Sequence, residues 1–313
     1  MALFRRSKKN DGWLAITMHE GAVCASHVRR VASGQPVVTL AVCESAADSV
    51  EDALEKLARK SDAQRHQCTT LLTPREYQLL SVESPNVPPA ELKTAIRWRL
   101  KDLLDYHVDD ATIDVLDIPQ DKNTPARSHL MYAIAAPSRI IEERQALFGQ
   151  AKIPLGVIDI PEMAQRNIAA LVEPEGRGIA MLSVDADGGL LTFTAGGELY
   201  HSRRIDIRPD QQLGSEQRTA ALERITLELQ RSLDHFDRQY HYIPLAKLVL
   251  APMGHDALGL REHLAQNLFT PVESLDLGSV LDLSATPALR EARQQQYFFL
   301  ALGAALRLEE RAL

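Results

Sequence analysis

The same succession of elements is predicted twice along this chain, and the repetition constrains the fold more than any other feature. Each half opens with three short strands joined by tight turns and continues into a helix and a further strand. The expected strand triplets are residues 13–18, 22–31 and 37–43, and residues 178–185, 190–195 and 198–207. Helices are expected at residues 49–60 and 216–240. The pattern predicts a duplicated α/β fold, and two such domains commonly leave a ligand cleft between them.

Between the two predicted repeats lies a segment that we interpret as an insertion. Strands are expected at residues 77–82, 111–118 and 128–136. A rigid proline-rich connector leads into a helix that runs to about Leu104. Pro89 falls in the first turn of this helix, where proline is tolerated because the N–H it lacks would have no helical partner. We therefore expect a small α/β subdomain at about residues 76–130.

Composition and charge argue against several classes of protein. The 313 residues suffice for roughly two domains, and a formal charge of −7 argues against a general nucleic-acid binder. No stretch approaches the roughly 18 apolar residues that a transmembrane helix needs. The basic residues 1–10 lack the apolar segment of a signal peptide, and we expect a solvated tail, with contact to an anionic membrane as the alternative.

The three cysteines are Cys24, Cys43 and Cys68, and they contain no CxxC pair. An odd and sparse set of this kind indicates a reducing compartment rather than a disulfide framework. We therefore expect three small, buried side chains that keep their thiols.

Several stretches resemble the PilM/MshI family of type IV pilus assembly proteins. They are residues 71–74 (LLTP), 91–98 (ELKTAIRW), 103–106 (LLDY) with 113–114, 227–236 (LELQRSLDHF) and 299–307 (FLALGAALR). Their order and spacing together carry the resemblance, which covers almost the whole chain. The divergence favours the MSHA pilus protein MshI over an orthodox PilM.

The resemblance implies an actin-like, two-domain α/β fold related to FtsA, with domain I at residues 11–175 carrying the insert and domain II at residues 176–313. It also implies a cytoplasmic scaffold, peripheral at the inner membrane, that binds the cytoplasmic tail of a bitopic PilN-like partner (MshJ-like in an MSHA system). Relatives help couple that membrane platform to the motor ATPase of the pilus.

Actin-like ATPases hold phosphate with glycine-containing hairpin turns, because bare backbone N–H groups can approach the anion closely. At the first turn, Thr17 and His19 stand where the family has an aspartate and a glycine. The second turn keeps more of the pattern, since Asp185 occupies the family's acidic position and is followed by Asp187, Gly188 and Gly189. The alternative for this turn is a tight Asp-Gly hairpin without a ligand.

The third turn should be glycine-rich, but residues 250–255 keep a single glycine, Gly254, and Pro252 removes an N–H donor. Because two of the three turns depart, we expect a pseudo-ATPase with no catalytic residue, metal ligand or cofactor. If ATP and Mg²⁺ bind at all, the residual site is Asp185, Asp187, Gly188, Gly189 and Gly254. The alternative is an active actin-like ATPase whose nucleotide state regulates pilus assembly. The cytoplasmic domain of GspL, which is similar in fold, is the precedent for a scaffold.

In the family, the partner's peptide lies between the first subdomain and the insert. The candidate partner-binding residues here are Ile96, Arg97, Arg99 and Leu100. Ile96 and Leu100 share one apolar helical face and can equally be core, and the arginines can equally be ordinary surface residues.

Asp159 and Glu162 fall where actin-like enzymes place the residues that orient the attacking water. We interpret both as charges at the N-terminus of the next helix.

Overall fold

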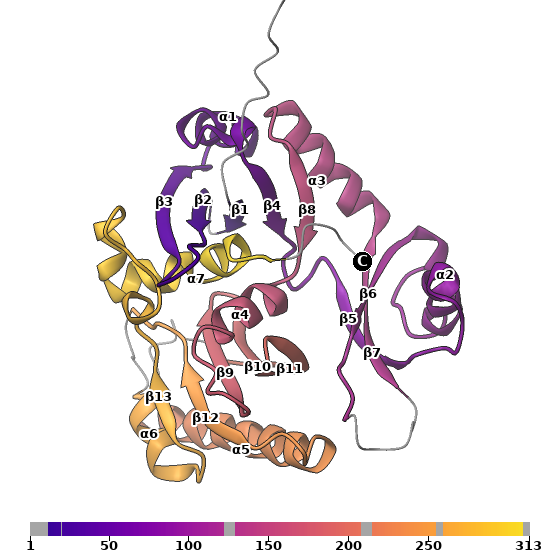
Figure 1. Cartoon of the computed structure of the whole chain (residues 1–313), viewed down its shortest axis with the longest axis vertical. Coiled ribbons are helices and arrows are strands. Elements are labelled where there is room, and N and C mark those ends of the chain that lie inside the picture. The colour runs from indigo at the N-terminus through magenta and orange to yellow at the C-terminus, as the bar shows by residue number, and fades with distance from the viewer. Residues whose placement is uncertain (1–11, 20, 122–128, 208–214, 255–258, 309–313) are drawn as a thin grey trace, which may run out of the picture. The chain divides into compact units, whose positions relative to one another are not determined.

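The structure is a computed structural model that describes residues 12–19, 21–121, 129–207, 215–254 and 259–308 (Figure 1). The predicted basic tail therefore lies outside the described residues. The chain divides into two compact units. The first unit comprises Met1–Ala25, Val42–Pro161 and Arg307–Leu313, and the second comprises Ser26–Ala41 and Glu162–Leu306. Helix α4 (Pro161–Ala169) thus groups almost entirely with the second unit, ahead of the predicted boundary at residue 175.

The first five-stranded sheet has the order β3-β2-β1-β4-β8. Its strands are β1 (Trp13–His19), β2 (Ala22–Arg29), β3 (Val37–Ser45), β4 (Gln67–Leu71) and β8 (Leu155–Asp159). β4 runs parallel to both of its neighbours, β1 and β8. Helices α1 (Val50–Lys60) and α3 (Ser138–Gln150) belong to the first unit. Helix α1 begins where predicted because the Ser49 side chain accepts a hydrogen bond from the Asp52 N–H.

The second five-stranded sheet has the order β11-β10-β9-β12-β13 and repeats the topology of the first. Its strands are β9 (Gly178–Asp185), β10 (Gly188–Ala195), β11 (Glu198–Ile205), β12 (Leu245–Leu250) and β13 (Val272–Ser274). The remaining helices of this half are α5 (Ser215–Gln239), α6 (Leu260–Asn267) and α7 (Ala292–Ala305). The repetition predicted from the sequence is confirmed.

The insert is a three-stranded sheet of order β5-β7-β6 with one helix, α2 (Pro89–Leu100). Its strands are β5 (Gln78–Glu83), β6 (Ala111–Asp117) and β7 (Leu130–Pro137). Because β7 is the central strand, the insert extends to Pro137 rather than to residue 130. Short 3-10 turns complete the chain at Ala63–Arg65, Val108–Asp110, Leu277–Ser279 and Pro287–Arg290.

The expectation of three reduced cysteines is wrong, because Cys24 and Cys43 form a disulfide. Cys24 lies in β2 and Cys43 in β3, which are neighbours in the first sheet, and their Cα atoms are 4.1 Å apart. Cys68 in β4 keeps its thiol and is buried, as predicted. The disulfide closes the hairpin that ends the first sheet at β3.

Candidate functional site

The turn between β9 and β10 is a two-residue hairpin connection that its own residues hold in shape. Gly188 pairs with Asp185 across the hairpin, and Asp185 Oδ1 accepts a hydrogen bond from the Asp187 N–H at 2.9 Å. Gly188 has a φ of +111°, and a Cβ there would lie 3.1 Å from the carbonyl oxygen of Ile205. A Cβ on Gly189 would lie 2.8 Å from the side chain of Ile207. Gly188 is therefore required by the fold itself, whether or not an anion binds, whereas a side chain at Gly189 would require Ile207 to move.

The third turn is bonded to helix α7. The N–H of Gly254 donates to Gln296 Oε1 at 2.7 Å, and Gln296 Nε2 donates to the carbonyl oxygen of Val184 at 2.9 Å. A Cβ on Gly254 would lie 2.8 Å from the Cα atom of Arg293, so close packing against α7 explains the glycine. The Gln296 carboxamide thus occupies the Gly254 N–H, which a nucleotide base could otherwise approach. It also links the third turn to β9, the strand that leads into the second turn.

The first turn has Thr17 at the position where the resemblance predicts a carboxylate, and this threonine side chain is buried. Thr17 is 7% exposed, and its Oγ1 has no hydrogen-bond partner among the described residues. His19 ends β1 and is partly buried. Gly21, with a φ of +70°, starts the return into β2. The intervening Glu20 lies outside the described residues.

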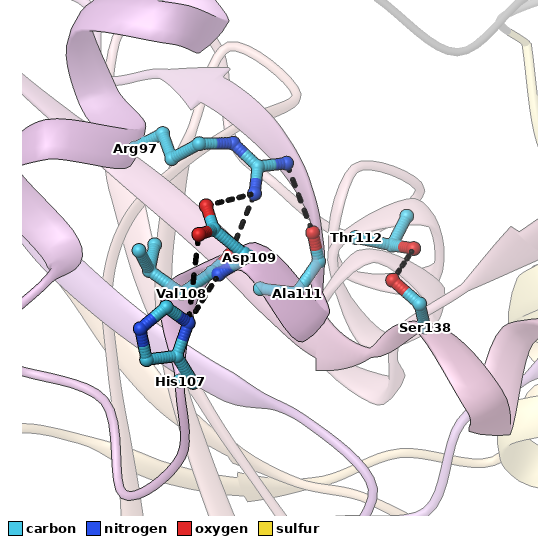
Figure 2. Close-up of polar contacts among 7 residues, drawn as sticks. All are labelled: Arg97, His107, Val108, Asp109, Ala111, Thr112 and Ser138. Carbon is cyan, nitrogen blue, oxygen red and sulfur yellow. Dashed lines mark hydrogen bonds and ion pairs between the residues drawn. The ribbon is translucent and has the colours of Figure 1, made fainter.

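Arg97 in the insert is used to hold the insert together (Figure 2). Its Nη1 donates to the carbonyl oxygen of Val108 at 2.6 Å and its Nη2 to that of Ala111 at 3.1 Å. The same guanidinium lies 3.9 Å from a carboxylate oxygen of Asp109. These contacts fasten the short turn that precedes β6 to helix α2, so Arg97 is a structural residue of the subdomain.

For the two apolar partner-binding candidates, Ile96 and Leu100, the structure supports the alternative that they are core residues. Ile96 and Leu100 have no exposed surface and belong to the core of the insert, packed with strand residues such as Ile113 and Ala133. Arg99 remains at the surface, 3.7 Å from Glu83. The sequence prediction missed Trp98, which is 73% exposed, and Leu103, which is 52% exposed. The exposure of Trp98 follows from helical spacing. Trp98 is two residues from both Ile96 and Leu100, so it points about 160° away from each of these buried side chains.

Neither a protein-family model nor a curated protein matches the sequence. Solved structures do match. A chain of a PilM–PilN type IV pilus biogenesis complex superposes with a TM-score of 0.73 at 17% identity, over 96% of this chain and 98% of that chain. A Bacteroides thetaiotaomicron protein with an actin-like ATPase fold gives a TM-score of 0.50 at 10% identity, over 92% and 98%.

This chain has the actin-like fold. The fold prediction is confirmed, and coverage of 96% means that the similarity includes the insert. The cytoplasmic domain of EpsL, an inner membrane component of the type II secretion system of Vibrio cholerae, gives a TM-score of 0.47 at 16% identity over 83% of this chain and 97% of that chain.

In this actin-like fold, each of the two acidic candidates next to α4 faces an arginine of its own unit. Glu162 lies in the first turn of α4, as predicted, and is 3.5 Å from Arg204. Asp159 instead ends β8, where Oδ1 accepts the N–H of Ile160 at 2.9 Å and Oδ2 forms an ion pair with Arg307. The interpretation of Asp159 as only a helix N-terminal charge is therefore corrected.

Within the ranges that the structure describes, no group of three or more His, Cys, Asp or Glu side chains is arranged to hold a metal ion. In the same part of the chain, every helix is too short or too polar to span a membrane.

Proposed function

We propose that this protein is an assembly scaffold of a type IV pilus platform that binds the cytoplasmic tail of a bitopic, PilN-like membrane protein. The observation that carries the proposal is the end-to-end similarity to a chain of the PilM–PilN complex, insert included. The sequence resemblance to the MshI branch extends the proposal to an MSHA-like system with an MshJ-like partner. The protein would then act in the cytoplasm, peripheral to the inner membrane, and contact the motor ATPase only through that platform.

The proposal includes a pseudo-ATPase, and the three turns support it. The Gly254 N–H is already bonded to Gln296, and Thr17 offers a hydroxyl where a carboxylate would be needed. Asp185 also accepts a hydrogen bond within its own turn. These contacts support the proposal, since a Mg-nucleotide would have to compete with the protein–protein hydrogen bonds of Gly254 and Asp185.

Within the insert, we place the contact with the partner at Trp98 and Leu103, the two exposed large apolar side chains of this subdomain's described residues. Exposed aromatic side chains are enriched at the energetic centres of interfaces. Arg99 lies beside Trp98 in the chain and can contribute a rim charge.

Isothermal titration with a synthetic N-terminal tail of the PilN-like protein tests this function. We expect binding in the micromolar range, weakened about tenfold or more by Trp98→Ala, which corresponds to about 1.4 kcal/mol. The matched control is Phe269→Ser, which removes a fully exposed aromatic side chain from the second unit and should leave the affinity unchanged. Absence of binding, under conditions where a PilM–PilN pair binds, would overturn the scaffold proposal.

A separate titration with Mg-ATP tests the pseudo-ATPase. We expect neither binding nor phosphate release from the wild-type protein. ATP hydrolysis that disappears in Asp185→Asn would instead establish the active ATPase.

A further inference from the structure

The carboxyl edge of the parallel strands in the first unit holds a buried, charged arrangement. In the printed registers, Ile16 lies opposite Thr70, and Leu71 lies opposite Asp159. Thr17 directly follows Ile16, so Thr17, Leu71 and Asp159 form one row across β1, β4 and β8. Side chains in register on neighbouring parallel strands share a face. In open α/β sheets, this edge is where ligands bind.

Arg307 covers this face of the sheet. Its guanidinium forms an ion pair with Asp159 and lies 5.9 Å from the ring centroid of Trp13. Trp13 precedes Thr17 by four residues on β1 and therefore points to the same face. The side chains of Arg307 and Asp159 are 9% and 8% exposed. Arg307 thus pairs with the Asp159 end of this row, and it also contacts Trp13, which lies at the start of β1 opposite Gln67.

A carboxylate this deeply buried requires a positive partner, since an unpaired charge in the interior is very costly. At the equivalent edge of an actin-like ATPase, a hydrated Mg²⁺ would be that partner. A guanidinium satisfies the charge but lacks the octahedral oxygen coordination with which Mg²⁺ bridges phosphates. The buried Thr17 hydroxyl, with no partner among the described residues, is a second oxygen at the same edge.

We propose that Arg307 permanently replaces a divalent cation at the carboxyl edge of β1, β4 and β8, and that Asp159 is a latent cation ligand occupied by the chain itself. This inference rests on the proposed lack of ATP turnover and gives it a mechanism. A divalent cation cannot share the site, because the carboxylate of Asp159 is already neutralised and the guanidinium repels further positive charge.

The probe is Mn²⁺, followed by electron paramagnetic resonance and by the thermal midpoint of the full-length protein. The variants are Arg307→Met, which keeps much of the side-chain volume, Arg307→Lys, which keeps a cation, and the double variant Asp159→Asn/Arg307→Met. We expect millimolar Mn²⁺ to raise the midpoint of Arg307→Met by roughly 3 °C or more, with bound Mn²⁺ in the spectrum. The wild type, Arg307→Lys and the double variant should show neither change.

Arg307→Met leaves a buried carboxylate without a counter-ion and can fail to fold. In that case Mn²⁺ in the refolding buffer should restore folded protein, and the double variant should fold without it, because removing both charges is far less costly than removing one. The proposal is overturned if Mn²⁺ acts on Arg307→Met no more than on the double variant, or if it binds the wild type at this edge. Neither result depends on ATP, so the proposed function stands or falls separately by its own titrations.

Discussion

The two five-stranded sheets have the same strand order, but side chains of different chemistry bond to them. In the first unit, charged groups do this, since Arg307 pairs with Asp159, and the buried Arg144 donates to the Leu71 carbonyl oxygen at 2.9 Å and to Glu76 at 2.8 Å. In the second unit, amides do it, since Gln296 links Gly254 to Val184.

Gln165 on α4 is the most completely satisfied of these amides. Its Nε2 donates to the carbonyl oxygens of Met181 and Leu190, at 2.9 and 3.1 Å, and to Thr192 Oγ1 at 2.9 Å. Its Oε1 accepts from the hydroxyl of Ser183 at 2.5 Å. A duplicated topology is thus kept while the polar groups against each sheet differ. The two units should therefore respond differently to substitution, reductant and pH.

The largest difference is expected from one added methyl group on a helix of each unit. A Cβ on Gly303, in α7, would lie 2.2 Å from the carbonyl oxygen of Ala164 in α4, whereas a Cβ on Gly149, in α3, meets nothing within 4 Å. Gly303→Ala should lower the free energy of unfolding by more than about 3 kcal/mol, because two helix backbones must separate. Gly149→Ala should change it by less than about 1 kcal/mol, and in the stabilising direction. Urea unfolding followed by circular dichroism measures both, and equal effects would contradict the packing of α7 on α4.

A smaller effect is expected from reduction of the Cys24–Cys43 disulfide. Its sequence separation of 19 residues corresponds to a stabilisation of about 3 kcal/mol in the chain-entropy model. Dithiothreitol should therefore accelerate amide hydrogen exchange in β2 and β3 and leave β10 and β11 unchanged. Cys43→Ser should exchange at the reduced rate with or without the reductant. If reductant does not alter exchange in β2 and β3, the disulfide does not form in solution.

The smallest of these effects is expected from mild acid, and it should be centred on the second unit. Burial, reinforced by His235 and Arg203, lowers the pKa of His201 to about 4. Between about pH 4 and pH 6.5, the unfolded chain binds a proton at His201 that the folded chain does not bind. The free energy of unfolding therefore falls as the pH falls through this range. From pH 6.5 to pH 5, the free energy of unfolding should fall by about 1 to 2 kcal/mol.

His201→Phe should remove this part of the pH dependence, because phenylalanine does not titrate. A phenyl ring suits the site, since the centroid of the His201 ring lies 5.6 Å from that of Phe193. Burial also lowers the pKa of His66 in the first unit, so amide exchange should be compared between β11 and β4. An unchanged pH dependence in β11 of His201→Phe would show that His201 is not the group responsible.

Much of the fold could be predicted because local pattern determines it. The strand expected at residues 178–185 is β9, and the Gly196-Gly197 hairpin has the two positive φ values that its turn requires. Continuous apolar sequence is less informative about ends, and α7 stops at Ala305 although the apolar Leu306 follows it. The predicted insert stops at about residue 130, before most of β7. This strand belongs to the insert because it pairs with β5 and β6, and pairing between strands that are distant in sequence leaves no local pattern.

The candidate site was predicted only in part, for a related reason. The departure of the first and third turns from the family pattern is visible in residue types alone, at Thr17 and Pro252, but its consequence for nucleotide binding stays a prediction. The contacts that hold these regions could not be predicted, because Gln296 and Gly254 are 42 positions apart and Arg307 and Asp159 are 148 apart. The disulfide was missed because cysteine spacing does not tell which strands become neighbours. A role of Asp185 in nucleotide binding remains a prediction.

The placement of the tryptophans has a practical consequence for anyone who studies this protein in solution. The chain has two of them, and both lie in the first unit, Trp13 in β1 and Trp98 in α2. Trp13 is 6% exposed and should emit at shorter wavelength, beyond the reach of acrylamide, whereas Trp98 should emit as an indole in water does. Excitation at the red edge of the absorption band selects the two tryptophans, so the emission reports on the first unit and not on the second. Without any attached dye, a single emission spectrum separates an event at the insert from an event at the sheet beneath Arg307.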